Sequence, residues 1–201
     1  MFPSLFQDRP QYFSIEEMIA LIDEPNRSTC FSILEDNREL FQKVQGSTHN
    51  HQNWPGGYFD HVQEVMNLGI LLYWALNFAR PLPFSLSDLL LAVFLHDIEK
   101  PWKYEIGPDG ELCHKSSMAT KEDHQCFRMA KLAQYGIVFT PEQENGMKYA
   151  EGELNDYSSK HRVMGPLAAA AHMCDVASAR IWFNHPMEKN DSWPGAKRIR
   201  D

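Results

Sequence analysis

Four residues with metal-binding side chains stand in or beside apolar segments of the chain. His96 and Asp97 directly follow the run LLLAVFL, and Asp175 lies inside AAAAHMCDVASA. His61 lies near the beginning of a third apolar segment. An unpaired buried charge is costly, so carboxylates in such runs are expected to face a site or a cationic partner. Two imidazoles and two carboxylates form a nitrogen and oxygen ligand set that suits a divalent transition metal ion.

The chemistry expected of such a centre is hydrolysis at phosphorus. A bound cation lowers the pKa of its water and polarises a phosphoryl group. The four residues are spread over positions 61–175, so they do not form a compact metal motif. By spacing alone, a buried network of His–Asp hydrogen bonds explains them equally well.

Three segments of the chain resemble motifs of the HD superfamily of metal-dependent phosphohydrolases. Residues 51–61, HQNWPGGYFDH, resemble the HHAxxGGxxxH stretch of HD-domain exoribonucleases and related phosphohydrolases. Residues 94–101, FLHDIEKP, resemble the LHDIGKP segment, and residues 171–178, AHMCDVAS, resemble the HxADxxAS segment. The resemblance covers about residues 46–182 and implies an all-α HD-domain helical bundle.

The resemblance assigns roles to the matching positions. The two histidines and two aspartates named above become the metal ligands. Lys100 matches the lysine of LHDIGKP and is expected to touch a substrate phosphate; the alternative is an exposed lysine at a helix end. His124 stands where binuclear members have a histidine that binds a second metal ion; the alternative is a solvent-facing histidine.

The chain departs from the family pattern at three positions. Ala150 stands where binuclear members carry a further histidine, so one divalent ion (Mn, Fe, Co, Ni or Zn, with Mg allowed) is expected and a second stays open. Glu99 replaces a glycine; it acts as general base on a metal-bound water, or it faces solvent or pairs with Lys100. Gln52 replaces the second histidine of HHA, whereas His51 matches the first. His51 is expected to contact phosphate or to orient a metal ligand.

The elements that position these residues are predicted to be the helices of a single all-α domain. Capping boxes predict helices that begin at Ser14, Ser32 and Ser85. The turn-forming residues 107–110 predict a short hairpin near 105–116.

Three segments of different character divide the chain. Residues 1–45 are predicted to form N-terminal helices that pack on the domain, and residues 46–183 to form the HD domain itself. Residues 184–201 have little periodicity and are predicted to form a loosely packed C-terminal tail.

Charge and aromatic content point to the size of the substrate. The formal net charge of −8 disfavours long nucleic acid, which is bound by lysine and arginine displacing counterions. A small phosphorylated molecule is compatible with this charge, because a bound cation reverses the local sign. Aromatic residues flank the motifs at Trp54, Tyr58, Trp102 and Tyr104. These residues either pack in the core or stack on a nucleobase. Because they cluster around both motifs, a nucleotide is the leading substrate class.

The sequence also bears on the cellular setting. Its four cysteines form no CxxC pair and are read as reduced thiols, so a cytoplasmic location is expected. The longest apolar run is far too short to span a bilayer, so no membrane partner is expected. A homo-oligomer is compatible with the sequence, although no segment identifies an interface.

Four functional hypotheses follow. The leading one is a metal-dependent phosphohydrolase that cleaves a phosphoester or phosphoanhydride bond of a nucleotide-like substrate. The alternatives are a 3′–5′ exonuclease on short RNA or DNA, a di-iron oxygenase on the HD scaffold, and a non-catalytic module stabilised by metal. The oxygenase requires the fuller histidine set that Ala150 interrupts.

Overall fold

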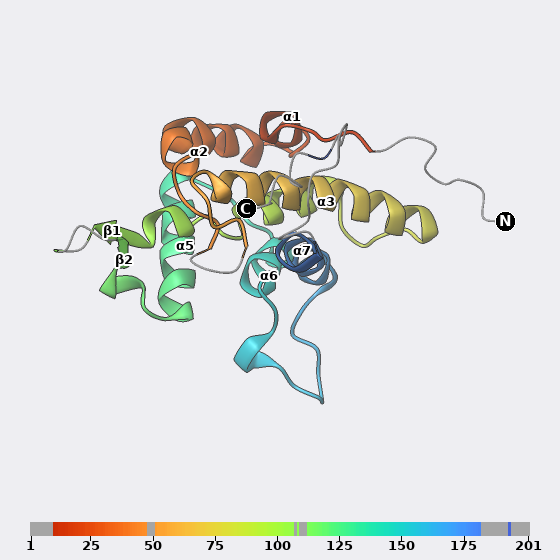
Figure 1. Ribbon diagram of the computed structural model, residues 1–201. Helices are drawn as coiled ribbons and strands as arrows, with labels where there is room; N and C mark the ends of the chain where they lie inside the picture. Colours follow the sequence, from red (N-terminus) through yellow and green to blue (C-terminus); the bar gives the residue numbers. More distant parts are fainter. Residues whose placement is uncertain (1–9, 48–50, 107, 109–111, 182–192, 194–201) are drawn as a thin grey trace.

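The structure is a computed structural model that describes residues 10–47, 51–106, 108, 112–181 and 193 (Figure 1). Within these residues the chain forms seven α-helices: α1 (Ile15–Ile19), α2 (Asn26–Phe41), α3 (Gly57–Ala79), α4 (Leu86–Leu95), α5 (Lys121–Tyr135), α6 (Pro141–Tyr149) and α7 (Pro166–Val176). Short 3-10 turns lie at η1 (Lys100–Trp102), η2 (Ser116–Met118) and η3 (Leu154–Asp156), and a π-helical turn, η4 (Ala177–Ile181), continues α7. The predicted all-α class is confirmed.

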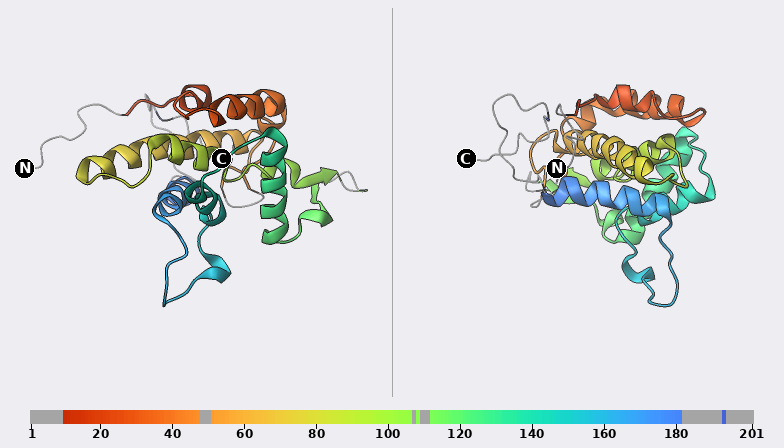
Figure 2. Two further views of the ribbon diagram at one scale, coloured as in Figure 1. Left: turned by 180° about the vertical axis from the view of Figure 1, so that it is seen from behind. Right: turned by 90° about the vertical axis from the view of Figure 1, so that its right-hand side faces the viewer.

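The helices stack in layers around α3 and α4. Helices α1 and α2 cover one side of this central pair, and α6 and α7 cover the other (Figures 1 and 2). Helix α4 is apolar around its whole circumference, and every residue from Leu89 to Leu95 is buried. A helix of this kind is stable only when other elements surround it. The layering therefore places the end of α4, where the HD pair follows, deep inside the molecule.

Capping boxes begin several of these helices. Ser14 and Glu17 form a reciprocal box at α1, and Ser85 and Asp88 form one at α4, as predicted. The box predicted at Ser32 is wrong, because α2 already begins at Asn26. Inside that helix the Ser32 hydroxyl donates to the Ser28 carbonyl oxygen at 3.2 Å. A serine hydroxyl in a helix interior bonds the preceding turn in this way instead of capping a new helix.

The predicted hairpin is present. Strand β1 (Tyr104–Ile106) pairs antiparallel with β2 (Leu112–His114), with Tyr104 opposite His114. Most of the turn signal at 107–110 lies outside the described residues. The hairpin projects from the bundle next to α5 (Figure 1).

The N-terminal helices are fastened to the central pair by specific contacts. The backbone N–H of Phe13 donates to the Asn67 side chain on α3 at 2.8 Å. The N–H of Asp23 donates to the Ser87 hydroxyl on α4 at 2.7 Å. The division at residues 45 and 183 stays a prediction.

The predicted tail contains one described residue, Trp193. Its ring packs edge-on against Tyr12, with ring centroids 4.7 Å apart. Its indole N–H donates to Glu64 Oε1 at 3.1 Å. Among the described residues, no helix combines the length and apolarity needed to cross a membrane.

Candidate metal centre

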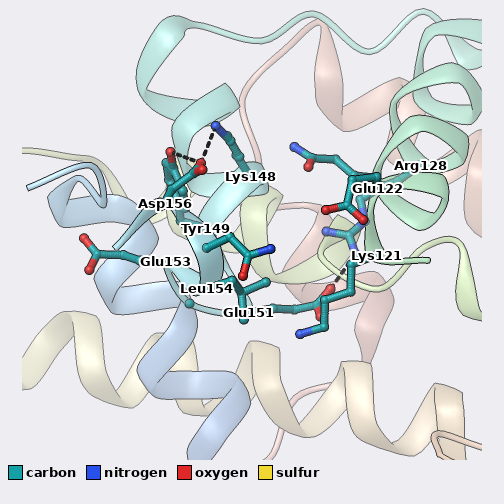
Figure 3. Close-up of a pocket in the computed structure, with 12 residues that line it drawn as sticks. Lys121, Glu122, Arg128, Lys148, Tyr149, Glu151, Glu153, Leu154 and Asp156 are labelled. Atoms are coloured by element: carbon teal, nitrogen blue, oxygen red, sulfur yellow. Dashed lines mark hydrogen bonds and ion pairs between the residues drawn. The ribbon is translucent and has the colours of Figure 1, made fainter. Parts of the chain in front are cut away.

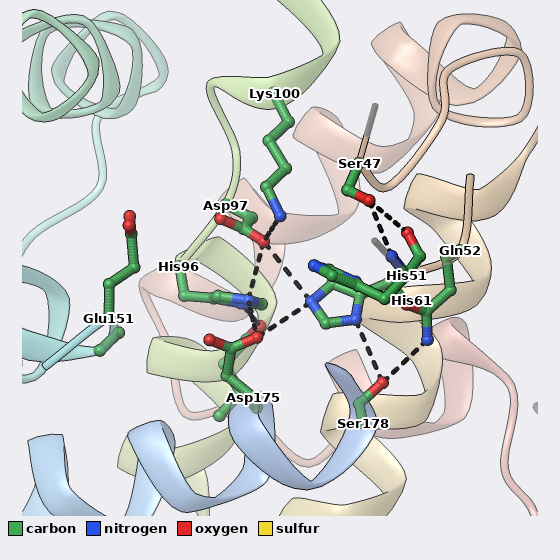
Figure 4. Close-up of polar contacts among 12 residues, drawn as sticks. Ser47, His51, Gln52, His61, His96, Asp97, Lys100, Glu151, Asp175 and Ser178 are labelled. Carbon is green, nitrogen blue, oxygen red and sulfur yellow. Dashed lines mark hydrogen bonds and ion pairs between the residues drawn. The ribbon is translucent and has the colours of Figure 1, made fainter. Parts of the chain in front are cut away.

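The four predicted metal ligands come together from three core helices (Figure 4). His61 lies on the second turn of α3, and His96 ends α4 with Asp97 directly after it. Asp175 lies on the last turn of α7. One donor atom from each residue lies within 4.8 Å of the other three. The buried group that the sequence predicted can therefore hold a metal ion.

The donor spacing fits one small cation. The Nε2 atom of His61 lies 3.2 Å from Asp175 Oδ1 and 3.5 Å from Asp97 Oδ2. The Nε2 atom of His96 lies 3.1 Å from Asp97 Oδ2 and 3.6 Å from Asp175 Oδ1. A cation about 2.1 Å from each donor places neighbouring donors about 3.0 to 3.4 Å apart. The imidazole–carboxylate separations are close to this range.

The imidazole nitrogens at the centre are free to act as ligands. Within the part of the chain that the structure describes, neither His61 Nε2 nor His96 Nε2 has a hydrogen-bond partner, although both are fully buried. The other ring nitrogen of His96, Nδ1, lies 2.7 Å from the Val93 carbonyl oxygen. A carbonyl oxygen only accepts, so Nδ1 carries a proton, and Nε2 is the nitrogen that faces the carboxylates and binds a cation after it loses its own proton.

His61 is held in the same tautomer by a hydroxyl group. Its Nδ1 atom lies 3.1 Å from the Ser178 hydroxyl oxygen. That hydroxyl donates its proton to Glu64 and accepts from the Gln52 amide at 3.1 Å. Because the Ser178 proton is directed at Glu64, we assign the donated proton to His61 Nδ1, which leaves Nε2 as the free donor atom. In both histidines a hydrogen bond at Nδ1 thus fixes the ring so that Nε2 faces the position of a cation.

Opposite charges surround the carboxylates of the centre. Burial favours protonated Asp97, but the positive charges of His96 and Lys100 outweigh it and hold the pKa of Asp97 well below its usual range. The Lys100 ammonium forms an ion pair with Asp97 Oδ2. Burial likewise disfavours the charge on Asp175, but its contacts with His61 and His96 lower the pKa of that carboxyl. Both acids are therefore ionised over the physiological range, as ligands of a cation must be.

A cavity of about 300 Å³ opens beside the centre. All of the predicted assisting residues line it: His51, Glu99, Lys100 and His124. Lys103 and Arg180 add two further cationic groups to its wall. The pocket therefore joins carboxylate ligands to cationic side chains suited to a phosphate.

His51 is half-buried against the metal ligands. Its ring centroid lies 4.9 Å from that of His61, and its Nδ1 lies 2.6 Å from the Gln52 amide oxygen. Burial, together with the positive charges of His61 and Lys100, lowers the pKa of His51 to about 4. His51 is thus neutral at physiological pH, and its Nδ1 donates to the amide oxygen.

Glu99 is neither solvent-facing nor paired with Lys100. Its two carboxylate oxygens accept hydrogen bonds from Arg128 at 2.8 and 3.1 Å, and the pair is almost fully buried. Arg128 also donates to Glu151 at 2.8 Å. Asp97, Glu99 and Glu151 bring one oxygen each within 4.8 Å of one another. Arg128 and Lys100 balance the charge of this second acidic group.

The position of a second ion stays open. His124 lies in the pocket wall, and its Nε2 donates to the Met118 carbonyl at 3.0 Å. It does not belong to either metal-binding group found among the described residues. Ala150 is fully buried, and its carbonyl accepts from His172 Nδ1 at 2.9 Å.

The aromatic residues that flank the motifs are not part of this pocket. None of the four lines the cavity in the described part of the chain. Tyr58 is buried against Phe41, with ring centroids 5.1 Å apart. Trp102 packs against Phe41 and Phe127, and the Trp54 indole donates to Asp60. Recognition of a base by these rings is therefore not supported.

Three residues that the sequence analysis did not single out for this role support the centre. Glu64 is fully buried and accepts hydrogen bonds from Ser178 and Gln52. The sequence held a weak signal for Glu64, because a residue three positions after His61 shares its helix face. Gln52 has a left-handed backbone, with φ 41°, which places its amide between His51 and Glu64. No local pattern predicts that conformation for glutamine.

Comparison of the chain with protein-family models, with curated proteins and with solved structures gave no match in any of the three.

Proposed function

We propose that this protein is a metal-dependent phosphohydrolase of the HD superfamily that cleaves a phosphoester or phosphoanhydride bond of a small, nucleotide-like substrate. The observation that supports it most is the paired orientation of His61 and His96. Each directs a buried Nε2, with no hydrogen-bond partner among the described residues, at the same two carboxylates. A purely structural His–Asp network would use these nitrogens in hydrogen bonds.

The residues around the centre have different roles in the proposed reaction. The two histidines and two aspartates would hold one divalent cation, which supplies a water of lowered pKa and polarises the phosphoryl group. Lys100 and Lys103 lie in the pocket wall, where they can neutralise phosphate oxygens. His51 is neutral, and because its Nδ1–H is donated to Gln52, its Nε2 can accept a hydrogen bond from a protonated phosphate oxygen or a water. Both oxygens of Glu99 are engaged by Arg128, so we assign Glu99 to holding the pocket wall instead of taking the proton.

The test combines metal content with a substrate screen. The protein is stripped of metal, reloaded separately with Mn, Fe, Co, Ni, Zn or Mg, and assayed for phosphate release from mono-, di-, tri- and cyclic nucleotides. We expect Asp97→Ala to lose both bound metal and turnover. Asp36→Asn, an exposed acid on α2, is the matched control and should keep both. Full metal content and activity in Asp97→Ala would contradict the proposal.

The same preparations separate the alternative functions. Release of nucleotides from short RNA or DNA, with no turnover of free nucleotides, would indicate the exonuclease. Oxygen consumption by the iron-loaded protein, without phosphate release, would indicate the oxygenase. Tight metal binding without turnover of any of these substrates would indicate a binding module.

A further inference from the structure

A second hollow adjoins the metal pocket, between α5 and the loop that follows α6 (Figure 3). Its volume is about 430 Å³. We call it the α5–α6 groove; its wall includes Lys121, Gln125, Arg128, Glu151, Leu154 and Asn155. Glu151 lines both the groove and the metal pocket. Arg128, almost fully buried, joins Glu151 to Glu99 and so forms the wall between the two hollows.

The two hollows carry similar side-chain charges, and they differ in the divalent ion proposed for one of them. In the groove, Arg128 is paired with Glu99 and Glu151, and Lys148 is paired with Asp156 at 2.8 Å. Lys121 and two further carboxylates, Glu122 and Glu153, also line the groove, and the balance leaves it slightly acidic. The metal pocket has a similar side-chain balance, because its three cationic groups face four carboxylates, and the proposed divalent ion is what makes it cationic. A phosphate group is therefore favoured in the metal pocket, and an uncharged polar group is favoured in the groove.

Two amide side chains of the groove are available to a ligand. Gln125 on α5 and Asn155 on the loop make no hydrogen bond with the part of the chain that the structure describes. Each amide offers one acceptor and two donor hydrogens. Such groups recognise the edge of a heterocyclic base or the hydroxyl groups of a sugar.

Leu154 supplies an apolar surface in the same groove. Its backbone is left-handed, with φ 49°, and its side chain is 51 % exposed. A left-handed leucine is strained, and such strain persists only where the surrounding structure holds it. Here the loop is held to α6 by Asp156, which accepts from Tyr149 at 2.9 Å and pairs with Lys148. An apolar side chain is thus held out into a polar groove, where it can pack against a flat ring.

We propose that the α5–α6 groove binds the nucleoside part of a nucleoside phosphate whose phosphate group lies at the metal centre. The inference rests on the proposed function for the placement of the phosphate. Leu154 packs against the base, and Gln125 and Asn155 bind its polar edge or the ribose hydroxyls. The shared wall at Glu151 and Arg128 lies between the base and the phosphate. Base recognition then needs none of the aromatic residues that flank the motifs.

The test measures selectivity in paired variants of the metal-loaded protein. The substrates are the four nucleoside 5′-monophosphates, ribose 5-phosphate and p-nitrophenyl phosphate. For Leu154→Ala and Gln125→Ala we expect the ratio of kcat/KM for the best nucleotide to that for p-nitrophenyl phosphate to fall about tenfold. Leu21→Ala, an equally exposed leucine on the far layer, and Gln134→Ala, an exposed glutamine on α5, are the controls and should leave the ratio unchanged.

A binding measurement separates failure of this inference from failure of the proposed function. Calorimetric titration of the wild-type protein with the four free nucleosides needs no turnover, and we expect Leu154→Ala to weaken the observed binding about tenfold. If nucleosides bind in a way that depends on Leu154 but the protein has no phosphohydrolase activity, nucleoside binding in the groove is supported and the proposed enzymatic function is wrong. If wild type and both variants release phosphate with equal selectivity, and no nucleoside binds, the groove is not the nucleoside site, whereas the proposed phosphohydrolase function stands. Equal kcat/KM for ribose 5-phosphate and the nucleotides would also overturn it, because the base would then contribute nothing.

Discussion

At the scale of single residues, the centre depends on which nitrogen of each imidazole carries the proton. The backbone carbonyl of Val93 holds the proton of His96 on Nδ1. The Ser178 hydroxyl does the same for His61, and that hydroxyl is oriented by its own hydrogen bond to Glu64. The backbone carbonyl cannot be removed by substitution, but the hydroxyl can. His61 is therefore the ligand whose orientation mutation can test.

We expect Ser178→Ala to weaken metal binding about 10- to 100-fold, because it removes the acceptor that holds His61 Nδ1–H. The measurement is a metal titration of the stripped protein, together with its thermal unfolding in chelator. Ser32→Ala, on the exposed face of α2, is the control and should bind metal normally. A general loss of folding would lower the unfolding temperature of the metal-free variant, whereas a positioning role leaves it nearly unchanged. Wild-type metal affinity in Ser178→Ala would refute the assigned role.

Metal binding should also compete with protons at His96. Burial lowers the pKa of His96, but the charges of Asp97 and Asp175 outweigh it and raise the pKa to about 10 in the metal-free protein. The histidine is therefore protonated at pH 7 and must lose a proton to become a ligand. We expect the apparent metal affinity to rise about tenfold per pH unit between pH 6 and 8 for one released proton.

Calorimetry in buffers of different ionisation enthalpy measures this proton release directly. The exposed His161→Ala variant should show the same pH dependence as wild type. Equal affinity at pH 6 and pH 8 would show that no ligand is protonated in the metal-free protein.

The raised pKa of His96 also affects the stability of the protein without metal. Protonated His96 stabilises the fold below pH 6.5, and this contribution is lost as the pH rises through about 10.

At the scale of elements, the loop before α3 is shaped by a close backbone contact. A Cβ atom on Gly57 would lie 1.8 Å from the Gln52 carbonyl oxygen, so only glycine fits at the beginning of α3. The close contact holds the loop so that the Gln52 amide donates to Glu64 and His51 lines the metal pocket. By contrast, Gly136 ends α5 in a left-handed conformation, with φ 83° and open space around its Cα.

We expect Gly57→Ala to destabilise the protein more than Gly136→Ala, which should cost about 1 kcal/mol from backbone strain alone. Gly57→Ala should also weaken metal binding, because the loop that holds the Gln52–Glu64–Ser178 network must shift. Urea unfolding and metal titration of both variants check this prediction. Equal effects of the two substitutions on stability and metal affinity would count against the close contact.

At the scale of the whole molecule, the N-terminal helices belong to the same core as the helices that carry the candidate metal ligands. Met18 and Ile19 on α1 are fully buried in a cluster that also contains residues of α3 and α4. The metal ligands therefore sit on helices whose packing depends on residues outside the segment 46–183.

We expect Ile19→Ala to lower the free energy of unfolding by about 2 to 5 kcal/mol, because it leaves a cavity in this shared core. Leu21→Ala, with a side chain that is 50 % exposed, is the matched control and should change stability by at most about 0.5 kcal/mol. Chemical denaturation of both variants is the measurement. An Ile19→Ala variant as stable as wild type would mean that α1 packs as a separate unit.

Local patterns predicted the all-α class, the hairpin and the helices that begin at Ser14 and Ser85. Each depends on residues close together in sequence, such as a serine and the acid three positions later. The box at Ser32 failed because the same local pattern occurs inside a helix that begins earlier. Local chemistry signals where a helix can begin, and the preceding chain decides whether one has already begun.

The sequence by itself identified the four residues that could hold a metal ion, because charged residues in apolar runs need a partner wherever those runs are buried. It did not determine whether they form a metal centre or a hydrogen-bond network. That depends on the ring tautomers, and the tautomer of His61 is set by Ser178 and Glu64, which lie 114 positions apart in sequence. The pairing of Glu99 with Arg128 was likewise decided by the packing of α5 against the end of α4. Such contacts arise only when helices far apart in the chain meet, so the tertiary structure alone decided how the ligands are oriented.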